Sequence, residues 1–175
     1  MARLNEILHA RSMISEPAEP RRLPPARAGR GIEFRNVGFH YPAKAGETPR
    51  WVLRNVSFAV PPGGTLGVVG ATGSGKSALI DLIPRVHDPQ EGEILIDGVS
   101  IRELPVHVLR AEIGHVPQET FLFSDTIRAN LAYGTEDGAP SEWAAGVAQL
   151  DETIGEFAGG YETLLSERGI NLSGG

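Results

Sequence analysis

Eight consecutive residues, from Gly70 to Ser77, have the types and spacing of a phosphate-binding loop. They read Gly-Ala-Thr-Gly-Ser-Gly-Lys-Ser and satisfy the pattern G-x-x-x-x-G-K-[ST]. Glycines let the backbone turn its N–H groups around an anion, and a following helix adds the positive end of its dipole. Lys76 would reach the β- and γ-phosphates of a nucleotide, and Ser77 would offer its hydroxyl to Mg²⁺. The predicted phosphate-binding residues are Gly70, Thr72, Gly73, Ser74, Gly75, Lys76 and Ser77.

A phosphate-binding loop of this kind lies between a strand and a helix, and the sequence predicts both. The apolar run Leu66–Val69 predicts a strand before the loop, and a helix is expected from Lys76 onward. The alternative is a glycine-rich turn that merely starts a helix. With only two lysines in the chain, an accidental match to the pattern has a probability of about 0.003.

Short β-type runs punctuated by glycine and proline predict the sheet that supports the loop. We expect strands at Ile32–Val37 and Val52–Val60, and a hairpin of Glu93–Asp97 and Ser100–Ile101 around Gly98.

Further along the chain, the pattern becomes largely helical. A helix at Val106–Ala111 follows Pro105, and Glu112–Val116 is expected to be another strand. Further helices are expected at Thr126–Ala132, Ser141–Gln149 and Glu152–Ala158, the second with Trp143, Val147 and Leu150 on one face.

The N-terminal segment has a different composition. Leu4, Ile7 and Leu8 have the spacing of a short amphipathic helix over residues 3–12. From Ser15 to Gly31 the chain has four prolines and four arginines, which predicts an extended linker that does not contribute to a core. The folded domain is expected to begin near Ile32.

Composition excludes several other classes of protein. The chain has 22 acidic and 16 basic residues and no cysteine, so disulfides, thiolate metal sites and cysteine nucleophiles are ruled out. Residues 51–175 carry a net charge of −10, which argues against an extended nucleic-acid partner. The longest uncharged stretch is interrupted by prolines and glycines, so no membrane span is expected in this chain, and no secretory signal is found.

Three motifs in order resemble the nucleotide-binding domain of ATP-binding-cassette (ABC) transporters. Gly70–Ser77 is followed by Val-Pro-Gln-Glu at residues 116–119 and by Leu-Ser-Gly-Gly at residues 172–175. The chain is most similar to the exporter (multidrug or lipid) type in the segments Leu109–Gly114, Phe121–Ile127 and Asn130–Gly134. The resemblance implies an α/β P-loop NTPase fold of ABC type, with an N-terminal antiparallel β-subdomain and part of the helical subdomain.

The resemblance also implies a role for individual residues. Tyr41 matches the aromatic residue that stacks on adenine, and its alternative is a core aromatic beside Phe39. Gln118 matches the catalytic glutamine that contacts Mg²⁺ and the attacking water. Ser173, Gly174 and Gly175 match the signature that closes over the γ-phosphate of the partner subunit, and residues 166–169 resemble a loop that meets the membrane domain.

The implied ligands are ATP and Mg²⁺, and the implied activity is that of an ABC-type ATPase. The implied partners are a second nucleotide-binding domain, in a homo- or heterodimer, and the transmembrane domain of an exporter, at the cytoplasmic face of the plasma (inner) membrane; no nucleic acid is expected. Residues 1–31 would be the linker that follows a transmembrane domain, and Arg21, Arg22, Arg27 and Arg30 would face anionic lipid.

Residues 32–175 would be a partial nucleotide-binding domain that extends to the signature. The C-terminal part of the core would be missing, and we expect this chain alone to be incompetent in hydrolysis. The alternatives are a non-hydrolysing regulatory nucleotide-binding module and a soluble cassette ATPase that acts on nucleic acid or ribosomes. His40, His87, His107 and His115 are interpreted as structural or solvent-facing, because all four precede the signature.

Overall fold

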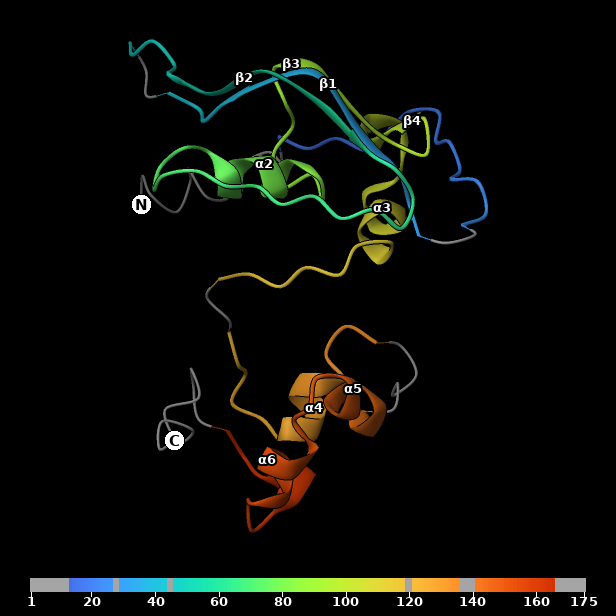
Figure 1. The fold of residues 1–175 in the computed structure, drawn as a ribbon, viewed down its shortest axis with the longest axis vertical. Helices are drawn as coiled ribbons and strands as arrows, with labels where there is room; N and C mark the ends of the chain where they lie inside the picture. Colours follow the sequence, from blue (N-terminus) through green and yellow to red (C-terminus); the bar gives the residue numbers. More distant parts are fainter. Residues whose placement is uncertain (1–12, 27–28, 44–45, 119–120, 136–140, 166–175) are drawn as a thin grey trace, which may run out of the picture. The chain divides into compact units, whose positions relative to one another are not determined.

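The computed structural model describes residues 13–26, 29–43, 46–118, 121–135 and 141–165 (Figure 1). The chain divides into two compact units, Met1–Gly114 and His115–Gly175, which we describe separately. No helix in the described parts is both long and apolar enough to cross a bilayer.

The first unit is built on an antiparallel sheet of four strands. They are β1 (Ile32–His40), β2 (Trp51–Val60), β3 (Glu91–Ile96) and β4 (Val99–Ser100), in the order β2-β1-β3-β4. The two long predicted strands and the hairpin around Gly98 are therefore confirmed. The N-terminal antiparallel β-subdomain implied by the family resemblance is present.

One face of this sheet carries the core. Helices α2 (Lys76–Leu82) and α3 (Val106–Ala111) and the 3₁₀ helix η1 (Ile101–Glu103) pack beneath it (Figure 1). The fully buried apolar side chains include Phe34, Val37, Phe39, Leu82, Ile94, Ile96, Leu104 and Leu109. Burial of a side chain of this size stabilises the fold by about 1.5–3 kcal/mol.

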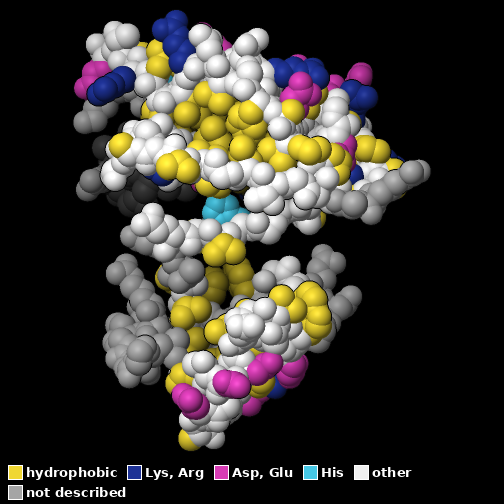
Figure 2. Space-filling model, viewed as in Figure 1, with side chains coloured by type: hydrophobic (Ala, Val, Ile, Leu, Met, Phe, Trp, Pro, Cys, Tyr) yellow, Lys and Arg dark blue, Asp and Glu magenta, His cyan; other side chains and the backbone are white. Residues whose placement is uncertain are grey.

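The opposite face of the sheet is charged. Arg35 of β1 lies between Glu33 and Glu93, with N–O distances of 2.7 and 3.2 Å. Figure 2 shows charged side chains of both signs along the upper edge of the first unit, where the sheet lies. Since alternate residues of a strand point to opposite faces, these charged side chains lie on the face away from the core, although Leu95 of β3 is also buried on that side.

The segment before the sheet is extended but packs against the first unit. Leu23 contacts the apolar core, and the Arg21 N–H donates to the Glu103 carbonyl at 2.8 Å. The Glu16 carboxylate accepts from the N–H of Val106, the first residue of α3, at 3.1 Å. The expectation that this segment would contribute nothing to a core is therefore wrong, because one leucine among the prolines and arginines reaches the core.

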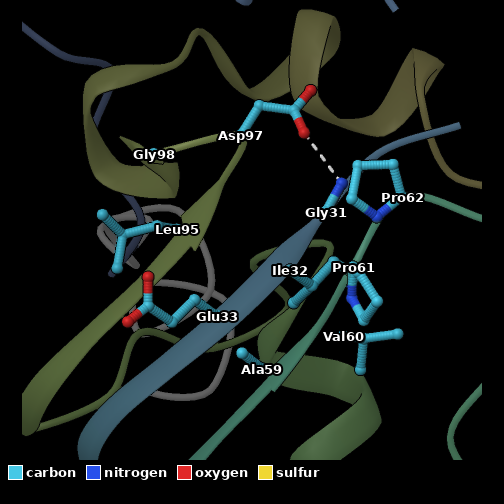
Figure 3. Close-up of a pocket in the computed structure, with 10 residues that line it drawn as sticks. All are labelled: Gly31, Ile32, Glu33, Ala59, Val60, Pro61, Pro62, Leu95, Asp97 and Gly98. Carbon is cyan, nitrogen blue, oxygen red and sulfur yellow. Dashed lines mark hydrogen bonds between the residues drawn. The ribbon is translucent and has the colours of Figure 1, made fainter. Parts of the chain in front are cut away.

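Arg30 anchors the end of this segment. It forms ion pairs of 2.9 Å with both Asp97 and Glu112 and also contacts the Pro24 carbonyl. Asp97 in turn accepts from the Gly31 N–H at 2.7 Å (Figure 3). Arg30 is 14% exposed and pairs with two acids, whereas Arg21 pairs with Glu103 but remains 59% exposed. The predicted contact of these arginines with anionic lipid stays a prediction.

Two predicted strands are not formed. Leu66–Val69 and Glu112–Val116 have no strand pairing in the described structure, and Val69 and Val116 are 97% and 92% exposed. A strand requires a neighbour that accepts its hydrogen bonds, and no described segment lies in register with either run. Neither segment is therefore a strand in the described structure, and Glu112 is instead the C-cap of α3.

The second unit is a small helical cluster. It contains α4 (Ile127–Leu131), α5 (Ser141–Val147), α6 (Asp151–Gly155) and the 3₁₀ helix η2 (Gly160–Glu162). Its core consists of Ile127, Ala145, Ile154 and Leu165. The three predicted helices are thus confirmed, each slightly shorter than expected. The face with Trp143, Val147 and Leu150 is exposed rather than buried in this core.

Candidate nucleotide-binding site

Tyr41 and the glycine-rich loop come together at one cavity of the first unit. The cavity has a volume of about 650 Å³, and its wall includes Tyr41, Arg50, Trp51, Gly73 and Ser74. Two predicted site elements that are distant in sequence therefore lie around the same space. Arg50 and Trp51 were not predicted as site residues. They lie at the start of β2, and nothing in the sequence there indicates that this end of the strand faces the Gly70–Ser77 loop.

A second cavity, at one end of the sheet, does not suit phosphates. It has a volume of about 300 Å³ and is lined by Glu33, Asp97 and mainly apolar residues, with no lysine or arginine among the lining residues (Figure 3). A phosphate-binding site needs cations or free N–H groups. The larger cavity has Arg50 beside Glu47 and two glycine-loop residues in its wall, so it is the better candidate site.

The loop backbone requires glycine at several positions. Gly73 and Gly75 have φ angles of +80° and +93°, a region in which side chains with a Cβ are strained. A Cβ at Gly75 would lie 2.9 Å from Leu53 Cδ2, and one at Gly70 would lie 2.6 Å from Ser74 Oγ. The loop therefore folds tightly on itself, as the sequence pattern predicts, and it also lies close against β2.

Lys76 is the cation of the loop. Its Nζ donates to the carbonyl oxygens of Gly70 at 2.7 Å and Ala71 at 2.8 Å, so the ammonium group closes the loop on itself. Gly75 is the N-cap of α2, which is held in place by the buried residues Ala78, Leu79 and Leu82. The ammonium is thus positioned over the loop by a helix that is anchored in the core.

Tyr41 is not the core aromatic of its strand. Its side chain is 46% exposed, whereas Phe39 is 1% exposed, and the two ring centroids are 4.9 Å apart. Phe39 fills the core, and Tyr41 follows the end of β1 and lines the cavity. His87, which was not predicted as a site residue, also packs against Tyr41, with ring centroids 5.4 Å apart.

The donor set of the loop fits a magnesium nucleotide. Ser77 is exposed, and no group of three metal-ligating side chains occurs in the described part of the chain. Mg²⁺ keeps most of its waters and binds through one or two protein groups together with the phosphates of a substrate. A single hydroxyl beside a phosphate-binding loop is therefore an appropriate protein ligand.

Of the predicted site residues, Tyr41, Gly73 and Ser74 line this cavity. The rest of the loop, including Lys76 and Ser77, adjoins these residues in sequence without lining it. Gln118 is exposed and belongs to the second unit. Ser173, Gly174 and Gly175, together with residues 166–169, lie outside the described residues. Their predicted roles remain predictions.

These features define a P-loop nucleotide-binding fold: a sheet with an apolar core on one face, a tight glycine loop closed by a lysine, and a helix that starts at that lysine. A family model described as ABC transporter matches residues 53–175. The chain belongs to this family, whose members are ATPases, and the predicted family, enzyme class and fold are confirmed. Membership implies nucleotide binding in general terms.

Similar proteins include exporters of known sequence and structure. YfiB of Bacillus subtilis (strain 168), described as an uncharacterized ABC transporter ATP-binding protein, is 49% identical over 146 residues, covering 82% of this chain and 25% of YfiB. The ATP-dependent lipid A-core flippase of Paraburkholderia xenovorans (strain LB400) is 42% identical over 166 residues, covering 93% of this chain and 28% of the flippase.

The structure of a bacterial Atm1-family ABC exporter with ATP bound matches with a TM-score of 0.85 and 36% identity, over 99% of this chain and 30% of that chain. The chain thus spans about a quarter of the length of the two curated relatives.

Proposed function

We propose that this chain is the ATP-binding domain of an exporter and that it binds ATP with Mg²⁺ between Tyr41 and the Gly70–Ser77 loop. The observation that carries the proposal is the shared cavity of about 650 Å³, lined by Tyr41, Gly73 and Ser74. A nucleotide needs an aromatic surface for its base and N–H groups with a cation for its phosphates. The site offers both within one unit.

Lys76 would bind the phosphates by exchanging partners. Its Nζ is held by the carbonyl oxygens of Gly70 and Ala71, which are neutral acceptors. Phosphate oxygens are charged acceptors, and charge-assisted hydrogen bonds are about twice as strong as neutral ones. The exchange therefore favours the nucleotide complex, while the same loop geometry is retained.

Further residues would act on the bound nucleotide. Ser77 and Gln118 would hold Mg²⁺, which when bound neutralises charge on the phosphates. Gln118 would also orient the attacking water. Ser173, Gly174 and Gly175 would contact the γ-phosphate that is bound by a second nucleotide-binding domain. These roles rest on the match of each residue to the family motifs.

The same proposal extends to the whole protein. One relative is described as an ATP-dependent flippase and one similar structure as an ABC exporter with ATP bound. Because both descriptions are of membrane transport, they support a transmembrane domain as the partner. We propose that residues 1–31 connect such a domain to the nucleotide-binding residues 32–175 at the cytoplasmic face of the membrane. Two nucleotide-binding domains would pair as a homo- or heterodimer, and ATP hydrolysis would drive export.

Calorimetry of ATP binding with Mg²⁺ tests the nucleotide site. Lys76→Ala removes the cation that closes the loop, so we expect ATP affinity to fall by about ten- to a hundredfold, the loss of one charge-assisted hydrogen bond. Arg22→Ala, which removes an exposed cation from the N-terminal segment, should leave the affinity unchanged. Equal ATP affinity of wild-type protein and Lys76→Ala would contradict the proposal.

A further inference from the structure

His87 lies against the predicted base-binding tyrosine. The His87 and Phe39 rings are stacked, with centroids 5.4 Å apart and an interplanar angle of 29°. The Tyr41 ring stands nearly perpendicular to both, at 79° to Phe39 and 89° to His87, with centroid distances of 4.9 and 5.4 Å. Edge-to-face contacts at these distances favour one relative orientation of the rings.

Tyr41 stands at a partly exposed position beyond the end of the sheet. Its side chain is 46% exposed and comes just after the last residue of β1, where no ladder fixes the backbone on both sides. A ring that is half in solvent samples several rotamers, and only an orientation that presents a face to the cavity can stack on a base. Phe39 supports the ring from the core, and His87 supports it from a second segment.

The segment that carries His87 is itself firmly held. On one side, the buried Arg85 donates to the Asp88 carboxylate at 2.9 Å and to the Ser15 carbonyl at 3.2 Å. On the other side, Gln90 is hydrogen-bonded to the end of β1, accepting from the His40 N–H at 2.8 Å through its side chain. His87 is therefore fixed relative to the strand from which Tyr41 extends.

The His87 ring acts through packing alone in this structure. Within the described residues it forms no hydrogen bond or ion pair, and its ring packs on the rings of Phe39 and Tyr41. We propose that His87 is a positioning residue that holds the Tyr41 ring in the orientation that stacks on the base of a nucleotide. The inference rests on the proposed function, since it assumes a nucleotide in the cavity that Tyr41 lines.

The test separates affinity for the base from affinity for the phosphates. Binding of ATP and of inorganic tripolyphosphate, both with Mg²⁺, is measured by calorimetry on the full chain. We expect His87→Ala to weaken ATP binding by about two- to tenfold, the value of one aromatic pair, and to leave tripolyphosphate binding unchanged. His87→Phe should restore ATP affinity, because it keeps a ring that can stack on Phe39.

Three further variants complete the test. His107→Ala, at an exposed position of α3, is the matched control and should change neither affinity. In the double variant Tyr41→Ala/His87→Ala, ATP affinity should equal that of Tyr41→Ala, because His87 then has no ring to position. His87→Leu keeps side-chain volume without a ring and should match His87→Ala, which separates loss of the ring from loss of packing.

Unchanged ATP affinity in His87→Ala, equal losses for ATP and tripolyphosphate, or an additive loss in the double variant would overturn the inference. Failure of the proposed function would give a different result. Either wild-type protein would bind neither ATP nor tripolyphosphate, or Lys76→Ala would bind both ligands as tightly as wild type does.

Discussion

At the scale of single residues, the site depends on backbone positions that only glycine can occupy without strain. Gly75 combines a φ of +93° with a close approach of 2.9 Å between its hypothetical Cβ and Leu53 Cδ2. It is also the N-cap of α2 and precedes Lys76. Any change at Gly75 therefore moves the loop, the cation and the start of the helix together.

This geometry predicts the effect of Gly75→Ala. A non-glycine residue in the left-handed region is destabilised by about 1–2 kcal/mol, and the contact with Leu53 adds to that cost. We expect the free energy of unfolding to fall by at least about 1 kcal/mol and ATP affinity to fall with it. Gly155→Ala is the control, since its added methyl group meets nothing within 4 Å. Chemical denaturation and calorimetry measure both effects, and a Gly75→Ala protein as stable as wild type would contradict the prediction.

At the scale of elements, the N-terminal segment is fastened to the sheet unit by ion pairs. The Arg30 guanidinium, whose side chain is 14% exposed, donates to Glu112 at the end of α3 and to Asp97 at the end of β3. The hydrogen bond from Arg30 is the main cause that lowers the pKa of Glu112 below its ordinary value. This link joins three elements that the sequence separates.

The lowered pKa of Glu112 predicts a pH dependence of stability. A carboxylate with a lower pKa in the folded state stabilises the protein above its ordinary pKa, and that contribution is lost as the pH falls through the folded value. Relative to wild type, Glu112→Gln should therefore have a lower melting temperature at pH 7, and the difference should shrink below about pH 4.5, the ordinary value of the group.

Thermal melts between pH 7 and pH 3 measure this effect. Glu19→Gln, at an exposed position of the N-terminal segment that carries Arg30, is the control and should follow wild type throughout. A difference between Glu112→Gln and wild type that stays constant across this range would show that the ion pair does not contribute through ionisation.

At the scale of the whole molecule, the predicted nucleotide contacts of the described cavity lie in one of the two units. Tyr41 and the loop belong to the unit Met1–Gly114, whereas the helices α4 to α6 have a separate core. A ligand that binds only the folded state stabilises it by about 2.7 kcal/mol at a hundredfold excess over Kd. This stabilisation should be concentrated where the ligand makes contact.

Hydrogen exchange read by mass spectrometry tests this distribution. Addition of ATP with Mg²⁺ should slow exchange most in residues 70–77 and around Tyr41, and much less in the core helices α4 to α6. Lys76→Ala should remove the protection at equal ligand concentration. Stronger protection in α4 to α6 than in the loop would place the main binding surface in the other unit.

The sequence by itself determined the features that depend on neighbouring residues. The Gly70–Ser77 loop, the helix that begins at Lys76 and the hairpin around Gly98 follow from residue types within a few positions of one another. Left-handed glycines and helix starts are local properties, so a pattern of eight residues suffices to predict them. The order of the motifs was enough to identify the family.

Only the tertiary structure decided the features that join distant segments. The sequence could not show that Leu66–Val69 lacks a strand partner in the described residues, because pairing depends on which segment lies alongside. The sequence also did not predict that Arg30 would form ion pairs with Asp97 and Glu112, or that His87 would pack on Tyr41. These contacts form when the chain folds back on itself, and residue types alone do not specify which partners then meet.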